Sequence, residues 1–385
     1  MNNDDFLDRK SFPGTAGGPF EIIVSAGEKI EAIPSVLFAL LLLALALIAR
    51  FGNWEQVLIL WAVQIGDWAL LWALPRSRIS SGPAKPPTLL LALLRLPFAL
   101  LPAPWWWIAQ GIGTALVIYG FWIEPQRITL THQQFRSEKL DPEVSLQILH
   151  FGDLHMERLG PREKRLMALL EELHPDLILF SGDILSYSNI EDPAAWADAR
   201  TVFAKLSAPM GTYFVPGSPP VDREDILPHI LSGLNIHVLR EDRIQLEYQG
   251  RPIDLIGLSC THQPFTDGPK LEALAQGKRD ALSILLYHTP DLAPIAAELG
   301  IDLQFSGHTH GGQVRLPLYG ALYAASLYGK RFESGRYEVG DMTLYVTRGL
   351  GMEGKAAPRV RFLCPPEINL WEITGVTSES EKPLP

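Results

Sequence analysis

Residues 144–155 read VSLQILHFGDLH, an apolar run that ends at a glycine and is followed at once by Asp153 and His155. The run predicts a buried strand over residues 144–151. Leucines at positions i, i+3, i+4 and i+7 from Leu166 predict an amphipathic helix after it. A buried strand followed by a helix of this kind is the repeating unit of a layered α/β domain.

The same alternation continues through residues 125–375. Four further apolar runs read PDLILFSGD (175–183), GTYFVPG (211–217), ALSILLYHTP (281–290) and IDLQFSGHTHGGQV (301–314). Helices are expected from Pro193, over 222–234 and over 291–299, and a β-hairpin is expected with its turn at 249–251. We therefore predict one α/β domain over residues 125–375, followed by a disordered tail at 376–385.

Ligand-type side chains follow several of these strands. They are Asp153, His155, Asp183, His288, His308 and His310. Open α/β sheets bind ligands beyond the carboxyl ends of their strands, so these side chains are expected to meet. Carboxylates and imidazoles without a thiolate favour Mn²⁺, Fe or Zn²⁺ over Ca²⁺.

The ligand set also indicates a reaction class. A carboxylate such as Asp183 can bridge two ions, and a pair of ions can activate a shared hydroxide for in-line attack on a phosphoryl group. Phosphoester hydrolysis is the chemistry we infer. Aminopeptidase-type hydrolysis also uses paired metals, so the ligand set alone leaves both substrate classes open.

Six motifs, taken in order, make the chain resemble a known family. They read GDLH (152–155), SGD (181–183), YHTP (287–290), GHTHGGQ (307–313), LYVTRGLG (344–351) and PPEINL (365–370). The chain resembles the calcineurin-like metallophosphoesterases, specifically their bacterial membrane-linked YkuE-like branch, over about residues 146–373. The resemblance implies a four-layer αββα sandwich around two divalent ions. It implies one ion held by Asp153, His155, Asp183 and His310. It implies a second ion held by Asp183, His288 and His308.

The stretch YFVPGSPP (213–220) departs from the family pattern, in which Gly-Asn-His-Asp or Gly-Asn-His-Glu ends this strand. Ser218 stands where the family has an Asn that binds the second metal, and Pro219 where it has a His that stabilises the transition state. A serine hydroxyl is a poor substitute for an amide oxygen, and proline has no proton to donate. Loss of such a donor typically costs about 10²–10⁴-fold in rate. Asp222 and His229 are the candidates to replace it.

A strongly apolar region precedes this domain. Its four stretches cover residues 33–49, 54–74, 88–103 and 105–123. Because a helix needs about 20 residues to cross the hydrocarbon core, we predict a transmembrane domain of about four helices over 33–124. The third stretch is short and contains Pro97 and Pro102, so a kinked or re-entrant segment is its alternative. Asp67 and Arg95 lie at matching depths from the loop at 75–87, and we predict that they pair.

Charge indicates the orientation and excludes one class of partner. Arg76, Arg78 and Lys85 lie between the second and third stretches, and Arg9, Lys10 and Lys29 precede the first. The positive-inside tendency therefore predicts an integral, multi-pass protein of the bacterial inner membrane, with residues 1–32 and the catalytic domain in the cytoplasm. Residues 34–123 carry a net charge of +3. Because the whole chain has a net charge of −10, the remaining residues carry −13. An acidic soluble part repels polyanions, so we expect no nucleic-acid partner.

These observations predict a membrane-bound, metal-dependent phosphohydrolase. Its expected partners are the lipid bilayer and a phosphorylated small molecule or a lipid-linked phosphodiester or diphosphate. One alternative is a weakened or inactive relative that binds a metal or phosphorylated ligand; another is a protein in which the helices do the main work.

Arg348 and Arg359 are expected either to contact a substrate phosphate or to form ion pairs. Five histidines are expected to be ordinary polar or core residues: His132, His150, His174, His237 and His262.

Overall fold

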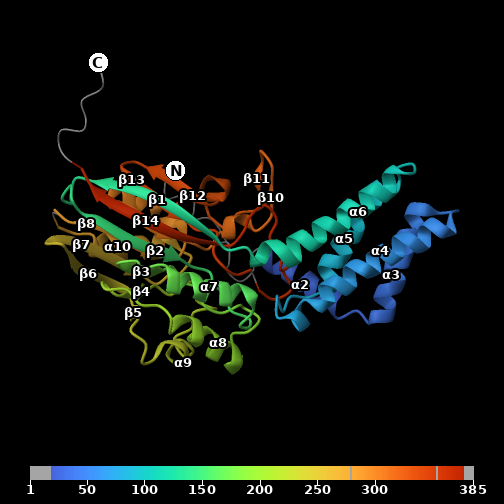
Figure 1. Cartoon of the computed structure of the whole chain (residues 1–385), viewed down its shortest axis with the longest axis horizontal. Coiled ribbons are helices and arrows are strands. Elements are labelled where there is room, and N and C mark those ends of the chain that lie inside the picture. The colour runs from blue at the N-terminus through green and yellow to red at the C-terminus, as the bar shows by residue number, and fades with distance from the viewer. Residues whose placement is uncertain (1–18, 278–279, 353, 377–385) are drawn as a thin grey trace, which may run out of the picture.

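The computed structural model describes residues 19–277, 280–352 and 354–376. A helical part is joined to a larger α/β domain, and the helices extend away from one end of that domain (Figure 1). Of the tail expected at 376–385, residues 377–385 lie outside the described residues, as do the basic residues Arg9 and Lys10.

Two six-stranded sheets form the α/β domain. The first has the order β1 (Thr129–Ser137), β14 (Glu367–Gly375), β2 (Ser145–Phe151), β3 (Leu177–Phe180), β4 (Thr212–Phe214) and β5 (His237–Val238). The second has the order β12 (Gly335–Val339), β13 (Met342–Val346), β9 (Leu303–Ser306), β8 (Leu282–Tyr287), β7 (Arg251–Leu258) and β6 (Glu241–Tyr248). A small hairpin of β10 (Arg315–Leu316) and β11 (Gly320–Ala321) lies outside both sheets.

The sheets face each other across a shared core that includes Ile148, Leu255 and Trp371. Successive strand residues point to opposite faces, so Leu149 packs on the other side, against a helical layer. That layer contains α7 (Pro161–Glu172), α8 (Pro193–Phe203) and α9 (Leu227–Leu231). The outer face of the second sheet is covered by α10 (Pro264–Leu274) and α11 (Ala293–Glu298). The order of layers agrees with the expected αββα sandwich.

Most of the expected elements are present. The hairpin forms with its turn at Gln249 and Gly250, but the helix expected over 222–234 is limited to the five residues of α9. β1 was not expected, and it pairs in parallel with β14, which follows more than 200 residues later. Its sequence, TLTHQQFRS, is mostly polar because it forms the edge of the sheet, so it lacks the apolar signal of a buried strand.

All four apolar stretches are helical: α3 (Ser35–Arg50), α4 (Trp54–Ala73), α5 (Lys85–Ala99) and α6 (Trp105–Ile118). Helix α2 (Pro19–Glu31) was not expected. Among the described residues, helices at 54–77 and 105–126 are long and apolar enough to cross a membrane. The bent pair of α2 and α3 adds at most a third crossing. Helices α3 and α5 have 16 and 15 residues and are shorter than a full span.

The predicted pair between α4 and α5 is confirmed. The Arg95 guanidinium donates to both carboxylate oxygens of Asp67, at 2.7 and 2.9 Å, and both side chains are buried. Arg95 also donates to the Gln110 carbonyl oxygen and the Thr114 hydroxyl of α6, each at 2.9 Å. One buried charge pair thus joins three helices.

We expect Asp67→Asn to destabilise the helical part by about 3 kcal/mol, because it leaves the Arg95 charge buried without its counter-ion. Thermal unfolding in detergent micelles measures the change. The control is Glu55→Gln, which lies in the exposed first turn of α4. If Asp67→Asn and the control Glu55→Gln both unfold at the wild-type temperature, the ion pair does not stabilise the bundle.

The helical part is joined to the α/β domain through buried polar contacts. The Glu124 carboxylate accepts hydrogen bonds from the backbone N–H groups of Leu363 and Cys364. Glu157 pairs with buried Arg359 at 2.9 Å and accepts a hydrogen bond from the backbone N–H of Ser81, in the loop between α4 and α5. Because these carboxylates are paired away from water, the helices hold a defined position on the domain.

Candidate metal centre

The candidate site lies on loops at the carboxyl ends of strands from both sheets. Asp153 follows β2, Asp183 follows β3, His288 follows β8, and His308 follows β9. The β3 and β4 loops approach so closely that a Cβ on Gly182 would collide with the backbone of Gly217. The structure therefore brings all six sequence-predicted residues into one buried cluster.

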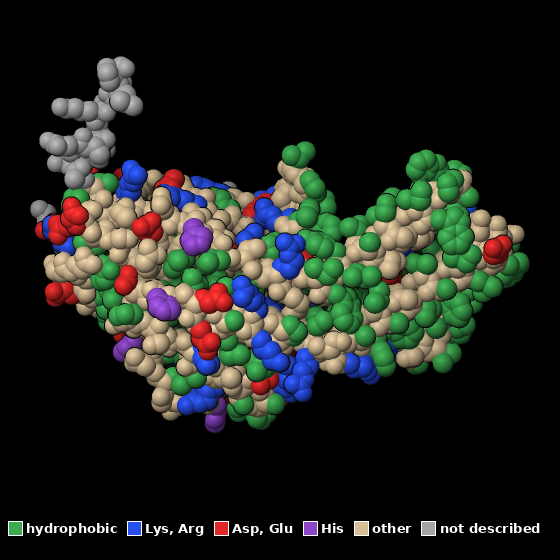
Figure 2. All heavy atoms as spheres, in the orientation of Figure 1, with side chains coloured by type: hydrophobic (Ala, Val, Ile, Leu, Met, Phe, Trp, Pro, Cys, Tyr) green, Lys and Arg blue, Asp and Glu red, His purple; other side chains and the backbone are tan. Residues whose placement is uncertain are grey.

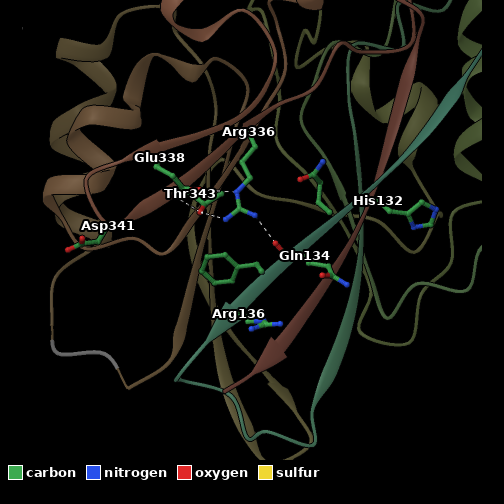
Figure 3. Close-up of a pocket in the computed structure, with 9 residues that line it drawn as sticks. His132, Gln134, Arg136, Arg336, Glu338, Asp341 and Thr343 are labelled. Carbon is green, nitrogen blue, oxygen red and sulfur yellow. Dashed lines mark hydrogen bonds and ion pairs between the residues drawn. The ribbon is translucent and has the colours of Figure 1, made fainter. Parts of the chain in front are cut away.

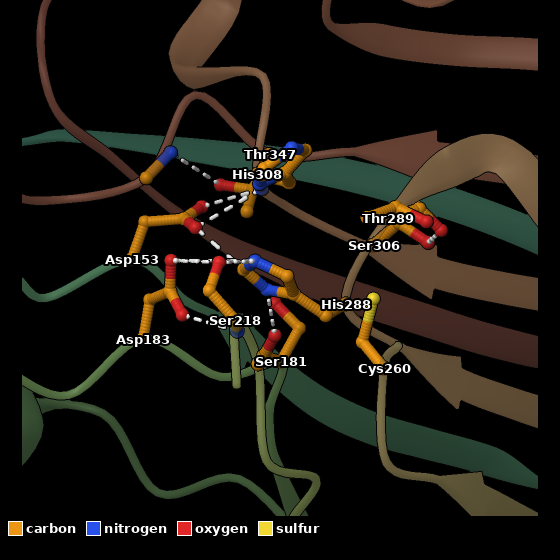
Figure 4. Close-up of polar contacts among 12 residues, drawn as sticks. Asp153, Ser181, Asp183, Ser218, Cys260, His288, Thr289, Ser306, His308 and Thr347 are labelled. Atoms are coloured by element: carbon orange, nitrogen blue, oxygen red, sulfur yellow. Dashed lines mark hydrogen bonds and ion pairs between the residues drawn. The ribbon is translucent and has the colours of Figure 1, made fainter. Parts of the chain in front are cut away.

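One group within the cluster consists of Asp153, His155 and His310, whose ligand-type atoms lie within 4.8 Å of one another. The Nε2 atoms of His155 and His310 are 3.0 Å apart. The backbone N–H of His308 donates to both oxygens of Asp153 at 3.0 Å, which holds that carboxylate toward the β9 loop (Figure 4).

Asp183 lies between this group and the next. Its Oδ2 atom is 3.7 Å from Nε2 of His155 and 3.3 Å from Nε2 of His288. Figure 4 shows the Asp183 carboxylate beside that of Asp153, with both directed toward His288. A single oxygen of Asp183 is therefore close to an imidazole from each group.

The second group consists of His262, His288 and His308. His262, which the sequence analysis expects to be an ordinary polar or core residue, is buried in this group, and its ring centroid lies 4.6 Å from that of His308. It follows β7 by four residues, and β7 lies beside β8 in the second sheet. The sequence signal was present, since His262 follows a strand as the other ligand-type residues do, but its segment, LSCTH, matches none of the family motifs.

Ser218 lies among the side chains of this second group. Its hydroxyl oxygen is 3.1 Å from Asp183 Oδ2, 3.1 Å from His262 Nε2 and 3.4 Å from His288 Nε2. Its backbone N–H donates to the other oxygen of Asp183 at 2.6 Å. Pro219 is exposed. At this point of the cluster the loop presents a hydroxyl, where the resemblance implied an amide.

Neither residue suggested as a replacement reaches the cluster as a ligand. Asp222 is buried below it and accepts hydrogen bonds from the backbone N–H groups of Asp183, Ile184 and Gly217 at 2.7–3.0 Å. Asp222 therefore positions the loop that carries Asp183. His229 stacks on Trp196 at the outer helical layer, with ring centroids 4.9 Å apart. The side chain beside Ser218 is His262 instead.

The backbone at the cluster has an unusual conformation. The residues with φ between 41° and 69° include Asp153, His155, Asp183, His262, His308 and His310. Positive φ is uncommon outside glycine, and strained backbone of this kind concentrates at functional sites. His262 shares this feature with five of the six predicted residues, all but His288, which is a second reason to place it with them.

The charges of the cluster suit cation binding. Burial and neighbouring histidines hold the pKa values of His308 and His310 well below the usual range, and burial lowers the pKa of His262 to about 4. These imidazoles are therefore neutral at pH 7 and have a free lone pair. Although burial opposes it, the contact with His288 holds the pKa of Asp183 well below its ordinary value. Burial opposes charge on His288 as well, but Asp183 raises its pKa to about 9.

The donor set fits divalent cations. Two buried carboxylates and five buried imidazoles face one another, and Nδ1 of His155 and of His310 has no hydrogen-bond partner among the described residues. Asp183 favours the protonated form of His288, and that charge balances part of the carboxylate charge. A cation that binds there has to displace that proton, so metal binding is coupled to proton release.

The remaining expected residues lie away from the cluster or are already paired. Arg359 forms its buried pair with Glu157, and Arg348 pairs with Glu367 at 3.2 Å, so the ion-pair alternative holds for both. His150 is a core residue beside Ser181, whereas three histidines are exposed: His132, His174 and His237.

A separate pocket of about 820 Å³ lies between the edge strands β1 and β12. Arg336 crosses it and donates to the carbonyl oxygen of Gln134 at 2.7 Å (Figure 3). The pocket lies at the start of β13, whereas the metal cluster lies beyond the opposite ends of the parallel strands. Its lining contains none of the clustered carboxylates and imidazoles, so we assign it no part in the site.

Comparison with known proteins identifies the family. A family model described as calcineurin-like phosphoesterase matches residues 146–312. The uncharacterized metallophosphoesterase YkuE of Bacillus subtilis is 31% identical over 278 residues, which are 69% of this chain and 93% of that protein. The chain belongs to the calcineurin-like phosphoesterase family.

Two further relatives indicate the reaction class. Phosphodiesterase YaeI of Escherichia coli is 28% identical, over 60% of this chain and 84% of that protein. UDP-2,3-diacylglucosamine pyrophosphatase LpxG of Chlamydia muridarum is 24% identical, over 67% of this chain and 94% of that protein. This metallophosphoesterase is therefore a hydrolase of phosphoester bonds, of a family that uses divalent metals.

Proposed function

We propose that this metallophosphoesterase is a membrane-bound phosphohydrolase that cleaves a lipid-linked phosphodiester or diphosphate at the cytoplasmic face of the bacterial inner membrane. The observation that carries the proposal is the position of Asp183 Oδ2 between imidazoles of two ligand groups, 3.7 Å from His155 and 3.3 Å from His288. A carboxylate in that position suits a bridge between two ions, which is the arrangement used in phosphoryl hydrolysis.

We assign the first ion, which is Mn, Fe or Zn in our proposal, to Asp153, His155, Asp183 and His310. We assign the second ion to Asp183, His262, His288 and His308. Relative to the family pattern, His262 takes the coordination position that Ser218 fills poorly, because a neutral imidazole is a good ligand for these metals. The second ion then has four protein ligands.

The chain's own residues prepare the site in three ways. Neutral His262, His308 and His310 present lone pairs without needing to lose a proton. Asp222 holds the Asp183 loop through three backbone hydrogen bonds. The Ser218 hydroxyl places a polar group between Asp183 and His262, within hydrogen-bond distance of both. When bound, divalent ions supply Lewis acidity that activates water and neutralises charge on a phosphoryl group.

The path of the chain gives the direction of each helix relative to the α/β domain. Arg50 donates to the carbonyl oxygen of Leu101 at 2.8 Å, so the loop after α3 and the loop after α5 lie together at the end remote from the α/β domain (Figure 1). Helices α4 and α6 both return from that end. Helices α3 and α5 must therefore carry the chain outward, and the basic loop with Arg76, Arg78 and Lys85 lies on the domain side, which favours a cytoplasmic catalytic domain.

The surface of the helices supports contact with lipid. Figure 2 shows hydrophobic side chains over most of the helical part and mixed polar side chains over the α/β domain. Large apolar residues such as Ile48, Phe51 and Trp54 are more than two-thirds exposed. Soluble proteins rarely expose apolar surface of this extent, whereas a bilayer would cover it.

The test is hydrolysis by the full chain reconstituted into phospholipid nanodiscs and loaded with Mn²⁺. We expect metal-dependent cleavage of a nucleoside diphosphate carrying a diacylated sugar, at a rate above that of soluble bis(4-nitrophenyl) phosphate. Cleavage of the soluble diester alone would contradict the lipid-linked substrate class. Tight binding of Mn²⁺ with no cleavage of either compound would favour the non-catalytic alternative that the GSPP loop suggests.

A further inference from the structure

We infer that the hairpin of residues 315–323 inserts its tip into the surface of the bilayer that holds the helices. This inference rests on the proposed membrane location and adds a second lipid contact, made by the α/β domain itself. The hairpin exposes large apolar side chains at its turn. Leu318 is fully exposed, and Tyr319, Leu322 and Tyr323 are each more than half exposed.

The exposure is concentrated in a short segment. Between β10 and β11 the turn reads PLY, and Leu318 lies at its tip with φ of 65°. A soluble domain gains nothing by presenting leucines and tyrosines to water on a projecting loop, and exposed apolar patches of this kind mark interaction sites. Leucine with tyrosine is also the composition of segments that lie at the boundary between head groups and acyl chains.

The hairpin is connected to the membrane helices through one intervening segment. Val314 and Arg315, at the start of the hairpin, lie beside Phe362, and the Arg315 N–H donates to the Phe362 carbonyl oxygen at 2.9 Å. On its other side, the Phe362 ring packs edge-on against Tyr119 at the end of α6, with centroids 5.9 Å apart. The next residue, Leu363, lines a shallow pocket together with Leu318.

The views agree with this connection. Figure 1 shows β10 and β11 projecting from the end of the domain that the helices join, beside the domain-side end of α6. In Figure 2 the hydrophobic side chains of the projecting hairpin continue into the hydrophobic surface of the helices. Blue side chains gather below the hairpin at this junction (Figure 2). Continuity with the lipid-facing surface identifies the bilayer, and not a protein partner, as the occupant.

The charged residues around the hairpin suit a head-group region. Arg315 and Lys330 share one carboxylate, Glu333, at 3.0 and 3.3 Å, and Arg331 adds a further positive charge. Lys330 also lies 3.5 Å from the centre of the Tyr319 ring. The base of the hairpin therefore carries a net positive charge, and each basic residue near an anionic leaflet contributes about 1 kcal/mol of attraction.

The hairpin is also joined directly to the metal centre. It follows the GHTHGG loop, and a Cβ on Gly312 would collide with the Tyr323 carbonyl and with Ala321. Gly312 has a φ of 78°, which glycine adopts without strain. This close packing links the position of the tip to that of His308 and His310. A tip embedded in the lipid surface would hold the metal loop near the head groups, where a lipid-linked phosphoryl group is found.

The test places an environment-sensitive fluorophore on Leu318→Cys in the full chain reconstituted in vesicles of phosphatidylethanolamine and phosphatidylglycerol. The native cysteines, Cys260 and Cys364, are buried, so the introduced thiol is the reactive one among the described residues. We expect a blue-shifted emission, loss of intensity with lipids brominated high on the acyl chain, and protection from aqueous iodide. Leu322→Cys is expected to behave in the same way.

The matched control is Gln249→Cys, in the exposed turn between β6 and β7, which is expected to respond to iodide alone. Iodide quenching of Leu318→Cys equal to that of the control would overturn the inference. Protection from iodide without quenching by brominated lipid would also overturn it, because a protein surface would then cover the hairpin. These readouts need no turnover, so they separate failure of this inference from failure of the proposed hydrolysis, which the nanodisc assay measures.

Discussion

Replacement of Asp183 with alanine is expected to remove both metal ions and to lower phosphodiester hydrolysis by about 10³-fold. Asp183 Oδ2 lies within 3.7 Å of imidazoles from both ligand groups, so its loss would remove the carboxylate that we assign to both ions. The same change removes the acceptor of the Ser218 backbone N–H. No other single substitution in the cluster is expected to affect both ions equally.

Metal stoichiometry by inductively coupled plasma mass spectrometry, on protein loaded with Mn²⁺, measures this prediction. Wild-type protein is expected to hold two ions, and Asp183→Ala none tightly. Asp341→Ala, in the exposed turn between β12 and β13, is the matched control and should retain both ions. If Asp183→Ala keeps one ion at wild-type affinity, Asp183 does not bridge.

The second large effect is expected at His262, which sequence reasoning assigned to no site. His262→Ala should lose one of the two ions and lower the hydrolysis rate by about 10–100-fold, by analogy with the loss of other metal-supporting residues. The physical reason is that Ser218, 3.1 Å from His262 Nε2, offers the second ion only a weak hydroxyl ligand once the imidazole is absent.

A rescue distinguishes a ligand role from a structural one. Adding Ser218→Asn to His262→Ala is expected to restore the second ion, because the amide oxygen would stand where the family has its asparagine. His132→Ala, an exposed histidine on β1, is the control and should leave both ions in place. Two ions in His262→Ala would show that His262 is not a ligand. A double variant that folds like wild type but gains no ion would contradict the exchange of roles between positions 218 and 262.

Much of the site was predictable because its residues lie next to apolar strands, which can be recognised in the sequence without knowing what they pack against. Asp153, Asp183, His288 and His308 each follow an apolar strand, and parallel strands bring their carboxyl ends to one edge of a sheet. The prediction that Asp67 pairs with Arg95 succeeded for a similar reason. Helix rise places both residues at the same depth, and a charge at that depth requires a partner.

The role of Ser218 was only half predictable. The sequence shows that GSPP replaces the family motif, but it names as candidates to compensate Asp222 and His229, which follow the motif in the chain. In the folded chain the Asp222 carboxylate accepts hydrogen bonds from three backbone N–H groups, and the His229 ring stacks on Trp196. His262 was missed because it comes from the second sheet, 44 residues beyond Ser218.

The sequence by itself therefore determined the α/β alternation of the domain, the apolar stretches, six of the clustered side chains and the loss of the third motif. These follow from local chemistry and from periodicity along the chain. The tertiary structure alone decided that His262 joins the cluster, that one Asp183 oxygen lies between the two imidazole groups, and that the exposed hairpin lies beside α6. The reason is that each of these depends on how two sheets and a helical bundle pack against one another. Contacts between segments far apart in the chain are set by that packing and leave no periodic signal in either segment.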